Sequence, residues 1–222
     1  MDDPQSLPMR VLIGPQELEG DLVLPPDCGA LIVFAHGSGS SRHSPRNLQV
    51  ARSLHRLGLG TLLFDLLQPE EALDRRKVFD IELLGQRMVE AIDWVDRNPA
   101  LAKPPLGLFG ASTGAAAALV AAAAHPQRVY AVVSRGGRPD LAPAALTRVS
   151  APTLLIVGGA DTEVLSLNQH ALRHLRPGCE LVIVAHATHL FEQPGTLEQV
   201  MKLAGDWFTR HLQELPGRRA EA

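Results

Sequence analysis

Residues 106–124 read LGLFGASTGAAAALVAAAA, and this stretch decides the fold of the chain. Its first part is rich in strand formers, and its second part is a run of alanines with high helix propensity. Between them lies Gly110-Ala-Ser112-Thr-Gly114, a G-x-S-x-G pattern. A serine at so sharp a turn needs small neighbours two residues away, which the two glycines provide. The pattern predicts a reactive Ser112 over a helix N-terminus, where developing negative charge is stabilised.

Length and composition describe a chain that can bury one substantial core. It has 222 residues, of which 45% are hydrophobic, and a formal net charge of -3 at pH 7. The mild acidity argues against nucleic acid and anionic membranes as partners. We expect a single domain over residues 1–222, with its core at about residues 10–212 and a frayed tail at residues 216–222.

No segment is expected to direct the chain into or across a membrane. Residues 1–6 are acidic and lack the apolar centre of a signal peptide. The longest apolar run, residues 115–124, has half of the about 20 residues that a bilayer requires. These features predict a cytoplasmic protein, for which the sequence allows either a monomer or a homodimer.

Neither the cysteines nor a pair of histidines indicates a cofactor or a metal. Cys28 and Cys179 show no metal-site spacing and are expected to be idle thiols. His170 and His174 lie four residues apart, but they lack a carboxylate partner and an H-E-x-x-H pattern. The sequence therefore predicts that no cofactor and no metal is bound.

Apolar runs and helical periodicity alternate along the chain. A continuous apolar run at residues 30–35 is typical of a strand buried on both faces of a parallel sheet. Before it, two short strands around Gly14-Pro15 favour an antiparallel hairpin. The alternation predicts an α/β fold with a mostly parallel, doubly wound sheet. Outside the opening stretch, strands are predicted at residues 10–13, 19–24, 30–35, 61–65, 129–134, 153–157 and 180–184, and helices at residues 45–57, 78–97, 141–146, 165–175 and 197–212.

Reactive side chains in an open parallel sheet gather at the carboxyl ends of its strands. Asp161 and His189 each follow a predicted apolar strand, and with Ser112 they give the chain order serine, aspartate, histidine. A serine hydroxyl becomes nucleophilic when a neutral imidazole takes its proton, and a carboxylate fixes the tautomer of that imidazole. We expect Ser112 to attack, His189 to transfer the proton and Asp161 to orient it. Glu163 and His186 are the competing acid and base.

Four segments resemble those of the α/β-hydrolases: residues 34–41 (FAHGSGSS), 110–114 (GASTG), 157–161 (VGGAD) and 187–191 (ATHLF). Within that fold the chain is similar to the small, uncapped serine esterases of the dienelactone hydrolase family, and the likeness extends from Arg10 to Leu212. The resemblance implies an α/β-hydrolase fold that acts on small esters. Some relatives are fused to a phosphoribosyltransferase domain, which this sequence is expected to lack.

The sequence departs from that family at two positions near the expected site. Classical dienelactone hydrolases use a cysteine nucleophile, whereas this chain carries Ser112, so lactone specificity is not implied. Relatives often have glycine where His186 stands, three residues before His189. We expect His186 to place a second imidazole close to the substrate.

The loop after the first parallel strand is expected to stabilise an oxyanion. By the resemblance, the donors are the backbone N–H groups of Ser38 and Thr113, and removing one such donor typically slows catalysis roughly 100- to 1000-fold. His36 is expected to buttress this loop, and Asp65 is expected to anchor it through hydrogen bonds.

Three arginines are expected at the rim of the pocket. Arg42 and Arg46 flank the oxyanion loop, and Arg135 follows a predicted strand. A guanidinium group can bind a carboxylate or phosphate with two parallel hydrogen bonds. One hypothesis is that Arg46 or Arg135 holds an anionic group of the substrate. The alternative is that these arginines form salt bridges that shape the loops.

Residues 135–151 separate two predicted strands and are too few for a cap domain. The site is therefore expected to be open and to accept short-chain or compact esters. The sequence leaves open whether the enzyme prefers esters, thioesters or lactones, because all of these pass through the same acyl-enzyme. A catalytically silent hydrolase fold that senses a ligand is a further alternative. A dinucleotide site is disfavoured because Arg42 stands where its third glycine is required.

Overall fold

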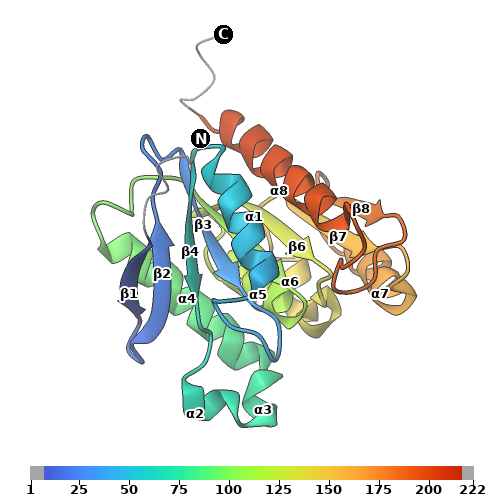
Figure 1. Ribbon diagram of the computed structural model, residues 1–222, viewed down its shortest axis with the longest axis horizontal. Coiled ribbons are helices and arrows are strands. Elements are labelled where there is room, and N and C mark those ends of the chain that lie inside the picture. The colour runs from blue at the N-terminus through green and yellow to red at the C-terminus, as the bar shows by residue number, and fades with distance from the viewer. Residues whose placement is uncertain (1–7, 217–222) are drawn as a thin grey trace.

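A computed structural model describes residues 8–216, and a sheet forms its centre (Figure 1). Within these residues, β1 pairs antiparallel with β2, β2 pairs antiparallel with β4, and all other neighbours are parallel. The predicted mostly parallel sheet with an N-terminal hairpin is thus confirmed. In spatial order the strands are β1 (Met9–Ile13), β2 (Leu18–Val23), β4 (Leu59–Phe64), β3 (Ala30–Ala35), β5 (Leu106–Ala111), β6 (Val129–Arg135), β7 (Thr153–Gly158) and β8 (Glu180–Val184).

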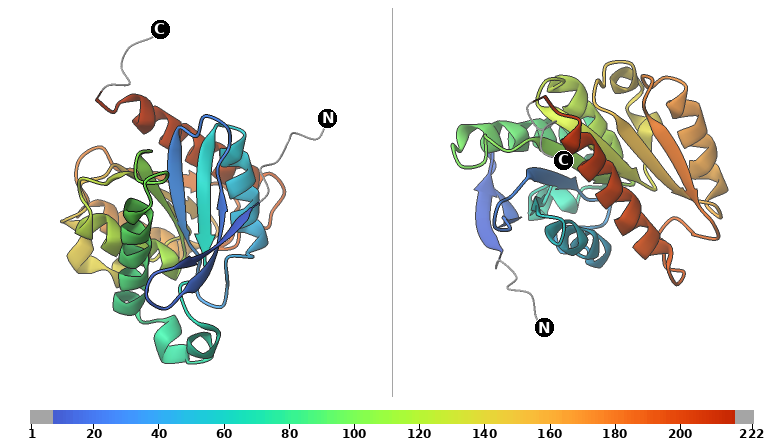
Figure 2. Two further views of the ribbon diagram at one scale, coloured as in Figure 1. Left: turned by 90° about the vertical axis from the view of Figure 1, so that its left-hand side faces the viewer. Right: turned by 90° about the horizontal axis from the view of Figure 1, so that it is seen from above.

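Helices cover both faces of the sheet, as a doubly wound fold requires. The helices of one face are α1 (Pro45–His55) and α8 (Thr196–Gln213), and those of the other are α4 (Ile81–Arg97), α5 (Thr113–Ala124) and α7 (Thr162–Leu172). In the left-hand view of Figure 2, α1 and α4 lie on opposite sides of the sheet. No cap domain is inserted anywhere between residues 8 and 216.

The two central strands alternate their side chains between two apolar cores. In β3, Leu31 and Val33 join the core under α4 and α5, whereas Ile32 and Phe34 join the core under α1 and α8. This alternation follows from the two-residue period of a strand that is buried on both faces. The alanine run makes α5 thin enough to pack closely, and ten of its residues are buried. The turn between β5 and α5 therefore joins a fully buried strand to a helix that is almost entirely buried.

The helix predicted over residues 78–97 starts too early. It begins at Ile81, because the carboxylate of Asp80 accepts a hydrogen bond from the Leu83 N–H and caps the first turn. Val78 instead ends a separate short helix, α3 (Arg75–Val78), which follows α2 (Pro69–Ala72). In Figure 1 these two short helices lie beyond the end of the sheet where β3 and β5 terminate.

Other predicted elements are present with bounds that differ by at most three residues. The largest difference is in α7, which begins at Thr162 rather than residue 165. The short helical piece predicted at residues 141–146 consists of a 3-10 helix (Pro139–Leu141) and α6 (Pro143–Leu146). The expectation of a signal-free start at residues 1–6 and that of a tail beyond Pro216 lie outside the described residues. Among the described residues, no helix is both long and apolar enough to cross a membrane.

Candidate active site

Ser112 lies at the tip of a turn that only glycine neighbours permit. Its φ of 52° is positive, which is rare for a residue with a side chain. A Cβ at Gly110 would lie 2.8 Å from the Ala115 nitrogen. A Cβ at Gly114 would collide with the backbone carbonyls of Ala35 and His36. The sharp turn thus needs both glycines, as the sequence predicts, and Gly114 also lets the turn lie directly against the end of β3.

The structure brings Ser112, His189 and Asp161 together, although 77 positions separate Ser112 from His189. His189 Nε2 lies 3.2 Å from Ser112 Oγ, and His189 Nδ1 lies 2.7 Å from Asp161 Oδ2. Because a carboxylate can only accept, the proton of a neutral imidazole resides on Nδ1. His189 Nε2 is then free to accept the hydroxyl proton of Ser112, which is the geometry of a general base.

Close backbone packing holds the segment that carries His189. Asp161 precedes α7 directly after β7, and its side chain is 14% exposed, whereas that of His189 is 37% exposed. A Cβ at Gly158 would lie 2.8 Å from the Thr188 carbonyl oxygen, so the end of β7 touches this segment. The carboxylate is thus sequestered, while the imidazole remains accessible to a substrate.

The loop after β3 meets the start of α5 at Ser38 and Thr113, which we call the oxyanion corner. The Ser38 N–H donates a hydrogen bond to Thr113 Oγ1 at 2.9 Å. Gly37 brings the loop against the nucleophile, because a Cβ there would lie 3.0 Å from Ser112 Cβ. Both residues whose amides are expected to bind the oxyanion are therefore beside Ser112. The Ser38 N–H is occupied by Thr113 Oγ1 and must leave it to bind an oxyanion.

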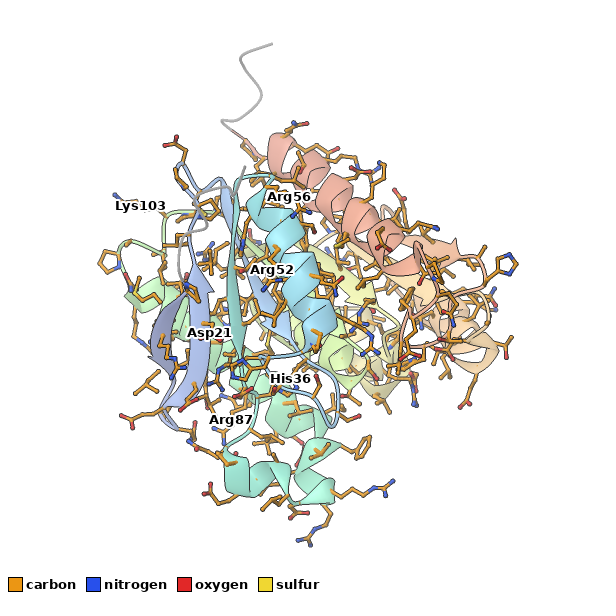
Figure 3. All side chains as sticks on the ribbon, viewed as in Figure 1. Asp21, His36, Arg52, Arg56, Arg87 and Lys103 are labelled. Atoms are coloured by element: carbon orange, nitrogen blue, oxygen red, sulfur yellow. The ribbon has the colours of Figure 1, made fainter. Side chains whose placement is uncertain are left out.

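His36 supports the oxyanion corner from below and does not reach the nucleophile. Its Nδ1 donates to the Gly37 carbonyl at 3.0 Å, and its Nε2 accepts from the Leu66 N–H at 3.1 Å. Burial lowers the pKa of His36 below its ordinary value, which keeps the ring neutral in this arrangement. Figure 3 labels His36 where β3 ends, near α2 and α3. The buttressing role predicted for this residue matches its contacts.

Two of the predicted rim arginines are engaged in ion pairs. The guanidinium of Arg42 pairs with Asp65 and Glu19, and its backbone N–H donates to Asp65 at 2.7 Å. Arg46 donates to Glu192 Oε1 at 3.0 Å. These contacts fit the alternative in which arginines shape the loops, and Asp65 anchors the loop as predicted.

Arg135 and His186 occupy opposite environments. Arg135 is buried, donates to Asn47 Oδ1 at 3.4 Å and lies 5.9 Å from the centre of the Phe191 ring. Burial, together with the charge of Arg46, lowers the pKa of Arg135 to about 10, so the side chain stays charged at neutral pH. His186 is exposed, has a φ of 61° and forms no hydrogen bond within residues 8–216.

Comparisons with known proteins agree with this geometry. A family model described as alpha/beta hydrolase fold matches residues 30–173. The chain belongs to this family. A crystal structure of a dienelactone hydrolase from Anabaena variabilis is 52% identical, covers 94% of this chain and 99% of its own, and has a TM-score of 0.89. The resemblance to the dienelactone hydrolases predicted from the four sequence segments is confirmed.

The chain also resembles a more distant protein of the same fold and part of a longer protein. The protein Est1E from Butyrivibrio proteoclasticus shares the fold at 15% identity, with a TM-score of 0.78 over 93% of this chain and 99% of its own. A Mycobacterium tuberculosis protein named "Putative phosphoribosyl transferase" is 57% identical over 204 residues, which are 92% of this chain and 46% of that protein. This hydrolase chain therefore spans about half the length of the curated relatives that it matches.

The hydrolase has a cavity of about 640 Å³ beside the oxyanion corner. Its walls include Ser38 and Thr113, but not Ser112 or His189. The remaining walls come from the loop after β3, the β1–β2 hairpin, the loop after β4, and the segment from α2 to the start of α4. No sequence pattern predicted this cavity, because α2 and α3 are short, highly charged and without apolar periodicity.

The other titratable candidates of the hydrolase lie outside this centre. His170 and His174 approach each other at 3.3 Å between their Nε2 atoms. No group of three or more potential metal ligands occurs within residues 8–216. Cys28 and Cys179 are free thiols, and burial raises the pKa of each above its ordinary value. A raised pKa makes a thiol less reactive at neutral pH.

Proposed function

We propose that this hydrolase is a serine esterase that cleaves small carboxylic esters through an acyl-enzyme. The observation that carries the proposal is the chain of contacts from Asp161 Oδ2 through His189 to Ser112 Oγ, at 2.7 and 3.2 Å. A serine at a nucleophile elbow with these two partners has every group that acyl transfer requires.

The reaction begins when Ser112 Oγ attacks the ester carbonyl carbon and its proton passes to His189 Nε2. Asp161 stabilises the imidazolium that forms, and the carbonyl oxygen gains negative charge beside the Thr113 N–H. The Ser38 N–H leaves Thr113 Oγ1 and donates to the same oxygen. The carbon–oxygen bond to the alcohol then breaks, and His189 returns the proton to the leaving oxygen. A water molecule, deprotonated by His189, attacks the acyl-enzyme and releases the carboxylic acid and Ser112.

The proposed acyl-enzyme does not specify which leaving group the substrate carries. Thioesters and lactones reach the same intermediate, so a thioesterase and a lactone hydrolase are variants of the same proposal. The dienelactone hydrolase of Anabaena variabilis, at 52% identity, supports the lactone variant. A catalytically silent sensor remains the non-enzyme alternative, and the intact contacts of Ser112 favour an enzyme.

The test is a panel of chromogenic esters whose acyl chains increase in length, assayed beside one thioester and one lactone. We expect hydrolysis of the short esters by the wild-type chain and a loss of about ten-thousandfold or more in kcat in Ser112→Ala. An equal rate in Ser112→Ala would contradict the proposal, and so would a folded wild-type chain that hydrolyses none of these compounds.

A further inference from the structure

The cavity borders the site proposed for acyl transfer at the oxyanion corner. Ser38 and Thr113 line it, and these are the residues whose N–H groups face the substrate carbonyl oxygen in the proposed mechanism. Its volume of about 640 Å³ lies within the range of small-molecule sites. A group attached to the reacting carbonyl therefore lies next to the cavity.

The position of His189 decides which half of the ester enters. The leaving alcohol takes its proton from His189 Nε2, so it must lie on the side of Ser112 that His189 occupies. None of residues 185–192, the segment that carries His189, lines the cavity. The cavity is thus on the opposite side of the carbonyl and receives the acyl group.

The walls of the cavity divide into an apolar part and a part rich in acceptors. The apolar side chains are Leu12, Leu18, Leu66, Leu67, Val78 and Leu84. The carboxylates of Glu17, Glu19 and Asp65 lie in the walls, whereas Arg42 is the cationic side chain among the wall residues. An acyl group that fills this space needs an apolar body and a polar end.

Neighbouring carboxylates already neutralise the charge of Arg42. Its guanidinium pairs with Glu19 and Asp65, and its Nε lies 3.5 Å from Asp21. Within residues 8–216, no ion pair neutralises Glu17. In Figure 3, Asp21 and His36 are labelled on the same side of the molecule, around this part of the sheet. The walls therefore carry excess negative charge, and a concave site concentrates the field of such charges.

Within the described residues, the wall residues include one buried donor and one buried acceptor without a hydrogen-bond partner. The donor is Arg42 Nε, which lies 3.5 Å from the carboxylate of Asp21. Gln16 Oε1 is buried without a hydrogen-bond partner within the described residues, although Gln16 lines the cavity. The Gln68 amide nitrogen is engaged by the Gln16 carbonyl, and both ring nitrogens of His36 are occupied. A buried acceptor without a partner favours a ligand that brings a donor.

From these observations we infer that the cavity binds the acyl part of the ester and selects acyl groups that end in a cation or a hydrogen-bond donor. Acyl groups that end in a carboxylate are disfavoured, because the guanidinium of Arg42 is already paired with carboxylates of the protein. This inference rests on the proposed esterase function and adds the class of acyl group to it.

Three p-nitrophenyl esters with one leaving group test the inference. The 4-(trimethylammonio)butanoyl ester carries a cation, the 5,5-dimethylhexanoyl ester is its neutral isostere, and the 4-carboxybutanoyl ester carries an anion. We expect kcat/KM to be about tenfold higher for the cation than for the isostere, and about tenfold lower for the anion. Added salt should reduce both ratios.

Variants of Glu17 assign the selectivity to the cavity. Glu17→Gln removes one charge, and Glu17→Gly also removes it while suiting the positive φ of 51° at this position. Both should lower the ratio of cation to isostere severalfold, because both remove the charge that attracts the cation. Glu198→Gln, on the exposed surface of α8, is the matched control and should keep the wild-type ratio.

The outcomes separate the two proposals. Rapid hydrolysis of the neutral isostere with equal kcat/KM for the cation and the anion would overturn the inference about the cavity and leave the esterase standing. Preference for the anion would overturn it as well, as would a ratio that Glu17→Gln and Glu17→Gly leave unaltered. Failure to hydrolyse any of the three esters would contradict the esterase itself.

Discussion

The backbone amide of Ser38 donates a hydrogen bond to the hydroxyl of Thr113 at 2.9 Å, although 75 positions separate the two residues. Thr113 is only 3% exposed, so water does not compete freely for this contact. The Ser38 N–H is therefore already occupied, and it must leave the Thr113 hydroxyl before it can donate to an oxyanion. The Thr113 hydroxyl thus competes with the oxyanion for this N–H.

Replacing Thr113 with valine removes the hydroxyl and keeps the shape of the side chain. We expect kcat to rise about two- to fivefold, because the Ser38 N–H no longer has to leave the hydroxyl in order to donate to the oxyanion. Affinity for a boronic acid transition-state analogue should rise in parallel, while KM changes little. Thr113→Ser restores the hydroxyl and should stay within about threefold of wild type. A valine variant with wild-type kcat and wild-type boronate affinity would contradict this role.

Gly114 should be among the least replaceable residues of the chain. A Cβ at this position meets the carbonyls of Ala35 and His36, and backbone atoms of a central strand cannot move aside cheaply. We expect Gly114→Ala to cost about 3 kcal/mol or more in the free energy of unfolding, measured by urea denaturation. Gly39→Ala is the control, because a Cβ there meets no atom within 4 Å and only its φ of 68° is unfavourable. Equal losses in the two variants would show that the close approach at the elbow is unimportant.

His186 should lower the stability of the native chain. Its φ of 61° lies in the left-handed region, its side chain is exposed, and it forms no hydrogen bond within residues 8–216. We expect His186→Gly to raise the free energy of unfolding by about 0.5 to 1 kcal/mol, since glycine adopts this conformation without a clash. His186→Ala retains a Cβ and should give no such gain. If thermal denaturation shows that His186→Ala stabilises the chain as much as His186→Gly does, backbone strain is not the cause.

His36 should make the protein sensitive to mild acid. Burial holds the pKa of His36 below its value in the unfolded chain, so the unfolded state binds a proton more readily. The stability that neutral His36 provides is therefore complete above about pH 6.5 and is lost as the pH falls below that value, by at most about 1.4 kcal/mol per pH unit. His55, whose pKa burial also lowers, adds a contribution of the same sign.

His36→Gln tests this pH dependence. The variant should be less stable at pH 7, because its two ring hydrogen bonds are altered, yet its stability should change less between pH 7 and pH 5. Urea unfolding at several pH values measures the slope. The exposed His186, which forms no hydrogen bond within residues 8–216, provides the matched variant, His186→Gln, which should keep the wild-type slope. A His36→Gln slope as steep as that of wild type would refute the explanation.

The sequence predicted the elements whose signals are local and redundant. The strands β3 and β5 appear as continuous apolar runs, and the alternation of runs and helices predicts the parallel sheet. Ser112, Asp161 and His189 were located because each follows a predicted strand, and strands of a parallel sheet end at one edge. The start of α4 was predicted three residues too early. In the sequence, an aspartate that caps a helix, such as Asp80, cannot be told from an acidic residue within the first helical turn.

Features that depend on contacts between distant segments were not predicted. Two such contacts join separate segments of the chain: the hydrogen bond from Ser38 to Thr113, and the ion pairs of Arg42 with Glu19 and Asp65. The cavity that these residues line is likewise formed by separate segments. No periodicity or spacing signals such contacts, because side-chain packing in three dimensions sets them. For the same reason, the sequence did not distinguish the ion-paired Arg46 from the buried Arg135.

The reactivity of one hydroxyl is the most direct test of the proposed chemistry. The folded chain is treated with a fluorophosphonate probe, and the modified peptide is identified by mass spectrometry. We predict a single adduct on Ser112, no adduct in Ser112→Ala, and labelling at least about 100-fold slower in His189→Ala. An adduct that persists in Ser112→Ala, or a folded wild-type chain whose Ser112 stays unmodified, would contradict the central claim.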